Sequence, residues 1–203
     1  MNPFTASLGG LLHTLPGPLR EHFGMSRGTK LFEGTMMRIW RREGLPGLLA
    51  FPTLWIGSRL DLLFTETGSG IPFRLENRVY ETADGQVRMD WIREFSFPSA
   101  SRRFAAVMRY EEGRGIVDDL GRRGSLEVEL HPEVDGAALV IRSGRQWLRL
   151  RRLRIPIPAF LAGEARVREW VAEGATYGIR VEVWNPLLGC VFGYEGTFRE
   201  VLP

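Results

Sequence analysis

The sequence predicts a mainly β protein: a single strongly curved antiparallel sheet or barrel of about ten strands, covered by short N-terminal helices. Hydrophobic residues make up 44% and charged residues 25% of its 203 residues, as in an ordinary folded domain. Beyond residue 28, apolar and polar residues alternate in short runs separated by turn residues. We therefore expect one domain over residues 1–203, with a helical segment at 1–27 and an antiparallel β body at 28–203.

The N-terminal segment carries the helical signals. One apolar stripe at helical spacing is formed by Leu8, Leu11, Leu12 and Leu15. That helix must end before Pro16, because proline cannot continue it. A second short helix is expected from Pro18 to Phe23, since Pro18 suits a first helical position and Gly24 suits a helix end.

The strongest strand evidence is a hairpin formed by Ile71 to Thr82 and Gln86 to Phe97, joined by the loop Ala83-Asp84-Gly85. This register pairs Phe73 with Phe95 and Val79 with Met89 on one face, and Arg74 with Glu94 and Arg78 with Asp90 on the other. A correct register must place apolar residues opposite each other on one face and opposite charges together on the other face. A two-residue loop would break both patterns.

A second hairpin is expected from Leu126 to Val134 and Ala137 to Ser143, with a two-residue turn at Asp135-Gly136. It would pair Leu130 with Ile141 and Glu129 with Arg142. The other predicted strands are Thr29 to Trp40, Arg103 to Tyr110, Trp147 to Ile155, Ala165 to Ala172, Tyr177 to Trp184 and Cys190 to Val201. Asp118 and Asp119 are assigned to a polar loop after Val117.

Cysteine usage and the apolar runs indicate a soluble cytoplasmic protein. Cys190 is the only cysteine, which excludes an intrachain disulfide and suits a reducing compartment. The longest apolar run, Leu45 to Gly57, contains Pro46 and Pro52, so it cannot span a bilayer. We expect this run to be a short helix or loop that covers one end of the sheet.

The positive charge gives little support for nucleic-acid binding. The net charge is +3, and Lys30 is the only lysine among 27 basic residues. Such a bias toward arginine reflects overall composition, so it does not by itself indicate phosphate recognition. No nucleic-acid partner is expected.

Metal and nucleophile chemistry are also disfavoured. His13, His22 and His131 lie on different elements without metal-ligand spacing, and they are interpreted as surface residues. Cys190 lies between apolar residues in a strand, which is typical of packing. No catalytic residue, metal ligand or cofactor is assigned.

A series of motifs in the second half of the chain points to a family. In order they are Trp91-Ile92-Arg93-Glu94-Phe95, Leu153-Arg154-Ile155-Pro156-Ile157-Pro158, Val167-Arg168-Glu169-Trp170, Asn185-Pro186-Leu187-Leu188-Gly189 and Tyr194-Glu195-Gly196. Their order and spacing resemble bacterial domain-of-unknown-function family 4166. Members of that family occur alone or fused behind an oxidoreductase domain similar to saccharopine dehydrogenase. The resemblance therefore implies a stand-alone or accessory β domain, and it transfers no catalytic residues.

The densest charge cluster surrounds Trp147. The candidate interaction surface consists of Arg142, Trp147, Arg149, Arg151 and Arg154, which would suit an acidic partner or an anionic surface. The alternative is a solvated sheet face. In that case a bulge near Arg151-Arg152 would turn Leu148, Leu150, Leu153 and Ile155 inward.

Arg93 is the most informative position. The register of the first hairpin places it on the apolar face, between Trp91 and Phe95, opposite Leu75 and diagonal to Asn77. A buried charge needs a partner, so either Glu169 meets it or the interior holds water or an anionic group. The candidate ligand-binding residues are Asn77, Trp91, Arg93, Glu169 and Tyr194.

Three functions remain open on the sequence alone. The first is a non-catalytic binding module whose apolar interior holds an amphipathic or acidic small molecule. The second is an accessory domain that docks on a partner oxidoreductase. The third is a small acid/base enzyme with Glu169 as the base, which lacks a second acid in the sequence.

Overall fold

A computed structural model describes residues 1–42, 66–121, 124–150 and 153–201 of the chain. Three short helices come first: α1 (Pro3–Leu8), the 3-10 helix η1 (Gly9–Thr14) and α2 (Gly17–Phe23). The strands are β1 (Gly28–Arg41), β2 (Ile71–Glu81), β3 (Val87–Ser96), β4 (Ser101–Glu111), β5 (Gly115–Leu120), β6 (Leu126–Asp135), β7 (Ala138–Leu150), β8 (Leu153–Pro156), β9 (Glu164–Val171), β10 (Thr176–Asn185) and β11 (Gly189–Val201). The expected helix or loop at Leu45 to Gly57 lies outside the described residues.

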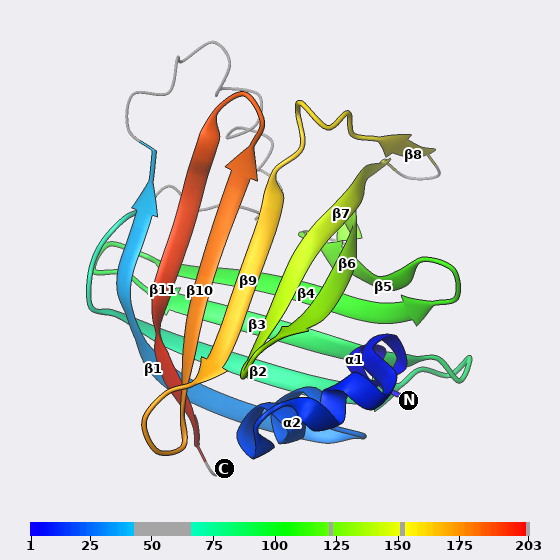
Figure 1. The fold of residues 1–203 in the computed structure, drawn as a ribbon. Coiled ribbons are helices and arrows are strands. Elements are labelled where there is room, and N and C mark those ends of the chain that lie inside the picture. The colour runs from blue at the N-terminus through cyan, green and yellow to red at the C-terminus, as the bar shows by residue number, and fades with distance from the viewer. Residues whose placement is uncertain (43–65, 122–123, 151–152, 202–203) are drawn as a thin grey trace.

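The strands form one antiparallel sheet that closes into a barrel, as predicted. Its order is β6-β5-β4-β3-β2-β1-β11-β10-β9-β7-β8, and an additional pairing of β6 with β7 closes ten of the strands. Strand β8 extends the free edge of β7. In Figure 1, β1, β11, β10, β9 and β7 stand upright in front, β2 to β5 cross behind them, and the helices cover the lower end.

The N-terminal helices differ from the prediction in part. The expected α-helix at residues 8–15 is instead a 3-10 helix that follows α1, because Gly9 takes a positive φ of 53° and ends α1. Leu8, Leu12 and Leu15 are buried, whereas Leu11 is exposed. The helix predicted from Pro18 to Phe23 is confirmed, and Gly24 follows its end. No helix in the described ranges is long and apolar enough to cross a bilayer.

The register of the first hairpin is confirmed, and that of the second is corrected. Strands β2 and β3 pair Phe73 with Phe95 and Arg78 with Asp90. Strands β6 and β7 instead pair Asp135 with Ala138, so the turn is Gly136-Ala137, and Leu130 pairs with Ser143, two residues from its predicted partner. The predicted pair of Glu129 with Arg142 is also wrong, because Glu129 lies at an irregularity of the register and Arg142 pairs with His131. A shift by an even number of residues preserves the faces, so the apolar pattern could not distinguish the two registers.

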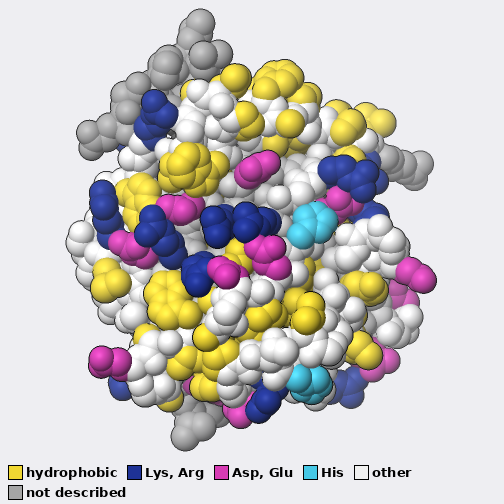
Figure 2. Space-filling model, viewed as in Figure 1, with side chains coloured by type: hydrophobic (Ala, Val, Ile, Leu, Met, Phe, Trp, Pro, Cys, Tyr) yellow, Lys and Arg dark blue, Asp and Glu magenta, His cyan; other side chains and the backbone are white. Residues whose placement is uncertain are grey.

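Two other strand assignments were wrong. Asp118 and Asp119 lie in β5 and not in a loop. The run from Trp147 to Ile155 is not one strand but the end of β7 followed by β8, which pair as a hairpin. Its aliphatic residues do not turn into the core: Leu150, Leu153 and Ile155 remain exposed. Figure 2 shows hydrophobic side chains gathered along the upper edge of this face of the molecule.

Close approach of β1 and β11 depends on two glycines. A Cβ atom at Gly34 would lie 2.1 Å from the carbonyl oxygen of Thr197 and 2.5 Å from the Cα of Phe198. A Cβ at Gly196 would similarly lie 2.3 Å from the carbonyl oxygen of Thr35. These atoms belong to backbone, which cannot move aside without opening the β1–β11 pairing.

Replacing Gly34 with alanine should therefore destabilise the barrel by about 1–3 kcal/mol, the usual range for overpacking. Urea denaturation of wild type and Gly34→Ala measures this difference. Gly17→Ala is the matched control, because a Cβ at Gly17 meets no atom within 4 Å. Equal stabilities of the two variants would contradict the steric argument.

Candidate functional site

The interior of the barrel contains ionisable and polar side chains among its apolar residues. The buried polar residues that alternate with core residues are Asn77, Arg93, Asp118 and Glu169, and His22 joins them from α2. They come from β2, β3, β5, β9 and the helix that covers the lower end. The polar side chains of the strands point inward because successive side chains alternate between the two faces of a strand, and each of these residues lies two positions from inward-facing apolar neighbours.

Arg93 occupies the position predicted from the sequence. It pairs with Leu75 on β2 and with Phe104 on β4, and it is only 8% exposed. Its guanidinium carbon lies 5.0 Å from the ring centre of Trp91 and 5.6 Å from that of Phe104, which is cation–π distance. Within the described ranges, no carboxylate forms an ion pair with this guanidinium.

Two buried carboxyl groups sense the charge of Arg93, one on β5, which is two strands from β3, and one on β9, across the barrel. Asp118 lies between the inward-facing Ile116 and Leu120 of β5, and Glu169 lies between Val167 and Val171 of β9. Burial raises the pKa of each carboxyl to about 7, although the positive charge of Arg93 acts in the opposite direction on both. Both groups can therefore gain or lose a proton near neutral pH.

Tyr194 completes this group from β11. It is 4% exposed and contacts Phe95 with ring centres 5.2 Å apart. Burial raises the pKa of its phenol, which also senses the charges of Arg93 and Glu169. Charged and polar groups of four strands thus face one region of the interior.

A second polar group lies where the helices meet the barrel. The Nδ2 atom of Asn77 lies 2.7 Å from Nε2 of His22, and Phe4 stacks on Trp91 at 5.5 Å. Burial, together with the charge of Lys30, lowers the pKa of His22 to about 3, so its imidazole is neutral. In the described part of the chain, His22 Nδ1, Asn77 Oδ1 and Trp91 Nε1 are buried without a hydrogen-bond partner.

The structure places every residue predicted to bind a ligand inside the barrel, with Arg93, Glu169 and Tyr194 in one polar group and Asn77 beside His22 in the other. Asn77, Trp91, Arg93, Glu169 and Tyr194 are all buried inside the barrel. A direct Arg93–Glu169 ion pair, the simplest structural explanation for Arg93, is not formed.

Sequence reasoning missed two members of the interior group. The alternation of Ile116, Asp118 and Leu120 was a signal for a strand with an inward aspartate. His22 was interpreted as a surface residue but is fully buried, and its place beside Leu19 and Phe23 on α2 was the available signal. His13 and His131 are exposed, as expected. Among the residues described, no group of three His, Cys, Asp or Glu side chains could hold a metal ion.

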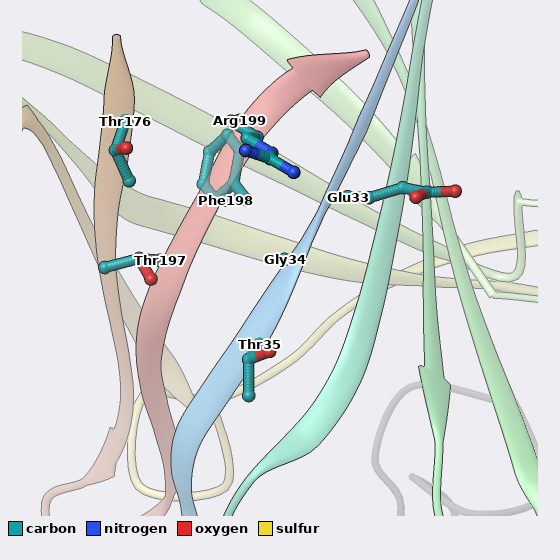
Figure 3. A pocket seen from close by; sticks show the side chains of 7 residues that line it. All are labelled: Glu33, Gly34, Thr35, Thr176, Thr197, Phe198 and Arg199. Carbon is teal, nitrogen blue, oxygen red and sulfur yellow. The ribbon is translucent and has the colours of Figure 1, made fainter. Parts of the chain in front are cut away.

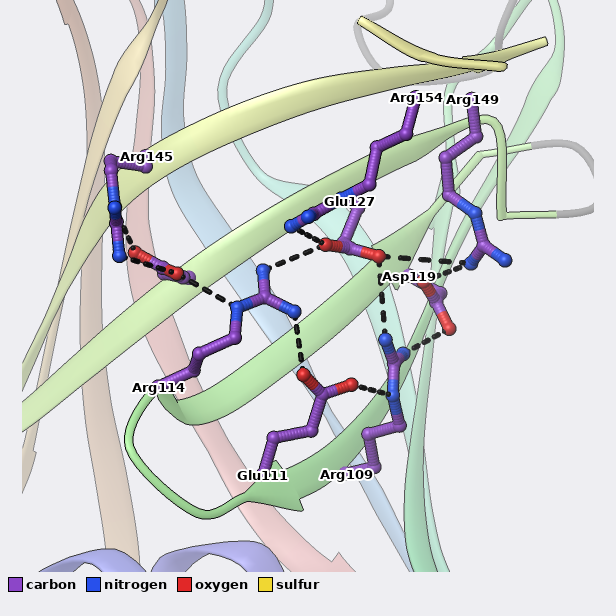
Figure 4. A network of polar contacts seen from close by, with 9 residues as sticks. Arg109, Glu111, Arg114, Asp119, Glu127, Arg145, Arg149 and Arg154 are labelled. Atoms are coloured by element: carbon purple, nitrogen blue, oxygen red, sulfur yellow. Dashed lines mark hydrogen bonds and ion pairs between the residues drawn. The ribbon is translucent and has the colours of Figure 1, made fainter. Parts of the chain in front are cut away.

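Two of the residues predicted as an interaction surface, Arg149 and Arg154, belong to an ion-pair network on the outer wall (Figure 4). Its pairs include Arg145–Glu129, Arg149–Asp119, Arg154–Glu127, Arg114–Glu127 and Arg109–Asp119. Trp147 is half-buried beneath guanidiniums, with that of Arg154 4.0 Å from its ring centre. Arg142 pairs separately with Glu133, and Arg151 lies outside the described residues.

A hollow of about 360 Å³ lies on the opposite part of the wall, over β1, β10 and β11 (Figure 3). It is lined by Glu33, Gly34, Thr35, Thr176, Thr197, Phe198 and Arg199. None of the residues predicted to bind a ligand lines it. Its polar side chains are short or exposed, so it lacks the desolvated charge that makes the interior group a stronger candidate site.

Comparison with known proteins gives a family match over most of the chain. The family model described as "Domain of unknown function (DUF4166)" matches residues 15–198. The uncharacterised protein YndH of Bacillus subtilis (strain 168) is 34% identical over 194 residues, which cover 93% of this chain and 92% of YndH.

Likeness to solved structures is weak. A protein of Thermobifida fusca YX provisionally assigned as a thioesterase II is 8% identical, covers 87% of this chain and 80% of its own, and has a TM-score of 0.25. An N-terminal dehydratase from the difficidin assembly line is 8% identical, covers 88% and 95% of the two chains, and has a TM-score of 0.21.

The raised pKa of Glu169 makes stability depend on pH. Its folded pKa of about 7 exceeds the ordinary value of 4.5, so the folded state holds a proton that the unfolded state releases. The stabilisation of the folded state by this proton has its full value below pH 4.5 and is lost as the pH rises through 7. Glu169→Gln should therefore gain stability over wild type between pH 5 and pH 8, on the order of 2–3 kcal/mol.

Urea denaturation at both pH values measures this gain. Glu164→Gln on the same strand is the control, because Glu164 is exposed and should show no such gain. A difference between Glu169→Gln and wild type that stays constant with pH would contradict the assignment.

Proposed function

The chain belongs to the DUF4166 family, and on that premise we propose that it is a non-catalytic binding module. Acting as one domain, it would hold an amphipathic or acidic small molecule in the interior of the barrel. The family description assigns no activity, so the proposal rests on the geometry of the interior group alone.

The observation that carries the proposal is the set of buried polar atoms without a protein partner. In the described part of the chain these include His22 Nδ1, Asn77 Oδ1, Trp91 Nε1, Asp118 Oδ1 and Glu169 Oε2. Each such group destabilises the fold by about 1–3 kcal/mol unless something satisfies it. Ordered water could satisfy the neutral groups, but the unpaired charge of Arg93 favours an anionic ligand group.

The surroundings of Arg93 define the ligand chemistry. Its guanidinium lies at cation–π distance from the rings of Trp91 and Phe104, and its N–H groups can donate to a carboxylate. Asp118 and Glu169 need not repel such a ligand, because carboxyl groups with pKa values near 7 can take up protons and donate hydrogen bonds to it. The apolar core around them suits a hydrocarbon body.

A small acid/base enzyme is the second candidate function. One observation favours it: Asp118 supplies the second buried carboxyl that the sequence reading lacked, and both carboxyls have pKa values near 7. One could accept a proton while the other donates one. The binding module ranks first because the unpartnered atoms of Asn77 and Trp91 belong to side chains that do not transfer protons near neutral pH but can form hydrogen bonds with a ligand.

The hypothesis of an accessory domain for a partner oxidoreductase has less support. The described arginines of the predicted surface are engaged with acidic residues of this chain. We place the protein in the cytoplasm within this proposal, since Cys190 is a free thiol, and we assign it no nucleic-acid partner and no cofactor.

Arg93→Leu tests the proposal. The variant should lose binding of a fluorescent fatty-acid analogue, dansylated undecanoic acid, by at least about 30-fold, the loss expected for a charge-assisted hydrogen bond worth about 2 kcal/mol. Its stability should fall by less than about 1 kcal/mol, because no ion pair is broken and both neighbouring carboxyls can become neutral. Fluorescence titration and thermal unfolding measure the two effects.

Arg74→Leu is the matched control, since Arg74 lies on the outer face of the adjoining strand and is exposed. It should bind the probe as wild type does. If wild type binds no probe and Arg93→Leu loses about 3–5 kcal/mol, Arg93 is purely structural and the proposal fails.

A further inference from the structure

The β7–β8 hairpin has two chemically different faces. Its register pairs Leu148 with Ile155 and Leu150 with Leu153, so these four aliphatic side chains share one face. Leu150, Leu153 and Ile155 are 49%, 65% and 44% exposed. A strand normally turns its apolar face toward a core, so this hairpin presents to solvent the face that would ordinarily be buried.

The exposed aliphatic face continues the inner lining of the barrel. Leu148 pairs with Leu126 on β6, and Leu126 pairs with Leu120 on β5. Leu120 packs against the core of the barrel. The hairpin therefore extends the inner surface of the wall beyond the rim, at the end opposite the helices (Figure 1).

The other face of the hairpin is cationic at its outer surface. The side chains of Arg145, Arg149 and Arg154 are 73%, 45% and 44% exposed. Their partners Glu129, Asp119 and Glu127 are less exposed, at 3%, 16% and 5%. The carboxylates thus lie beneath the guanidiniums, and an approaching surface meets arginine first.

Apolar loop tips lie at the same end of the barrel. Phe160 and Leu161 follow β8, Leu187 lies in the β10–β11 turn, and they are 53%, 48% and 66% exposed. The Nδ2 atom of Asn185 donates to the carbonyl oxygen of Phe160 at 3.0 Å, which ties the two loops together. Apolar side chains of two other loops are therefore exposed at the same end of the barrel as the aliphatic face of the hairpin (Figure 1).

We propose that this end of the barrel docks on an anionic lipid bilayer. The aliphatic face and the loop tips would enter the acyl-chain boundary. Arg149 and Arg154 each use one nitrogen in an ion pair, Nη1 with Asp119 and Nη2 with Glu127, and their other N–H groups would contact lipid phosphates. A second copy of the chain is a poorer occupant, because β8 has four residues and ends at Pro156, which hinders pairing with another strand. The inference does not depend on a ligand inside the barrel.

Vesicle co-sedimentation tests this docking. Wild type should sediment with vesicles of phosphatidylcholine mixed with phosphatidylglycerol, and added salt should weaken the binding. The double variant Leu153→Ser/Ile155→Ser should lose at least about tenfold in affinity, since it removes two of the three exposed aliphatic side chains of the hairpin. Because both side chains are exposed, thermal unfolding should be unchanged.

Met37→Ser is the matched control, because Met37 is 58% exposed on β1 and lies outside this end-surface. It should bind vesicles as wild type does. Failure of wild type to sediment with anionic vesicles would overturn the proposal, as would full binding by the double variant. Dimerisation of wild type that the double variant abolishes, measured by sedimentation velocity, would assign the face to a second copy instead. The titration with the soluble fatty-acid probe tests binding inside the barrel, so its result does not depend on whether the protein docks on vesicles.

Discussion

Closure of the sheet by the pairing of β6 with β7 is the constraint on which the other features depend. An open sheet would leave one face of each strand beside water, where a polar residue is unremarkable. Once the sheet closes, all inward-facing side chains share one enclosed volume, and residues from distant parts of the chain become neighbours. Arg93, Asp118 and Glu169 are brought together in this way, although they lie far apart in the sequence.

Electrostatics inside the barrel follow from that enclosure. Desolvation disfavours charge on each carboxyl, and the guanidinium of Arg93 compensates for about one negative charge. The interior is therefore closest to neutral when Asp118 and Glu169 hold one proton between them. Such a group changes its protonation readily when another charge enters, which is a property of binding and catalytic sites more than of a packed core.

The register of a hairpin could be predicted from the sequence where two independent patterns had to agree. The first hairpin was predicted correctly because apolar pairs and charge pairs fixed one register between them. The second hairpin lacked that test, since a shift by two residues keeps both faces. Arg93 and Glu169 could be placed inside from alternation alone. Asp118 was missed because two adjacent aspartates resemble a loop, and the exposed face of β8 was missed because apolar alternation was taken to mean burial.

The outer-wall network has a consequence for behaviour at high temperature. Burying Glu127 and Glu129 beneath arginines requires removal of their hydration, and that penalty diminishes on heating because hydration of ions carries a negative entropy. Hydrophobic stabilisation by the core levels off over the same range. The wall formed by β4 to β7 therefore gains relative strength as the temperature rises, and thermal unfolding of the barrel would begin elsewhere in the sheet.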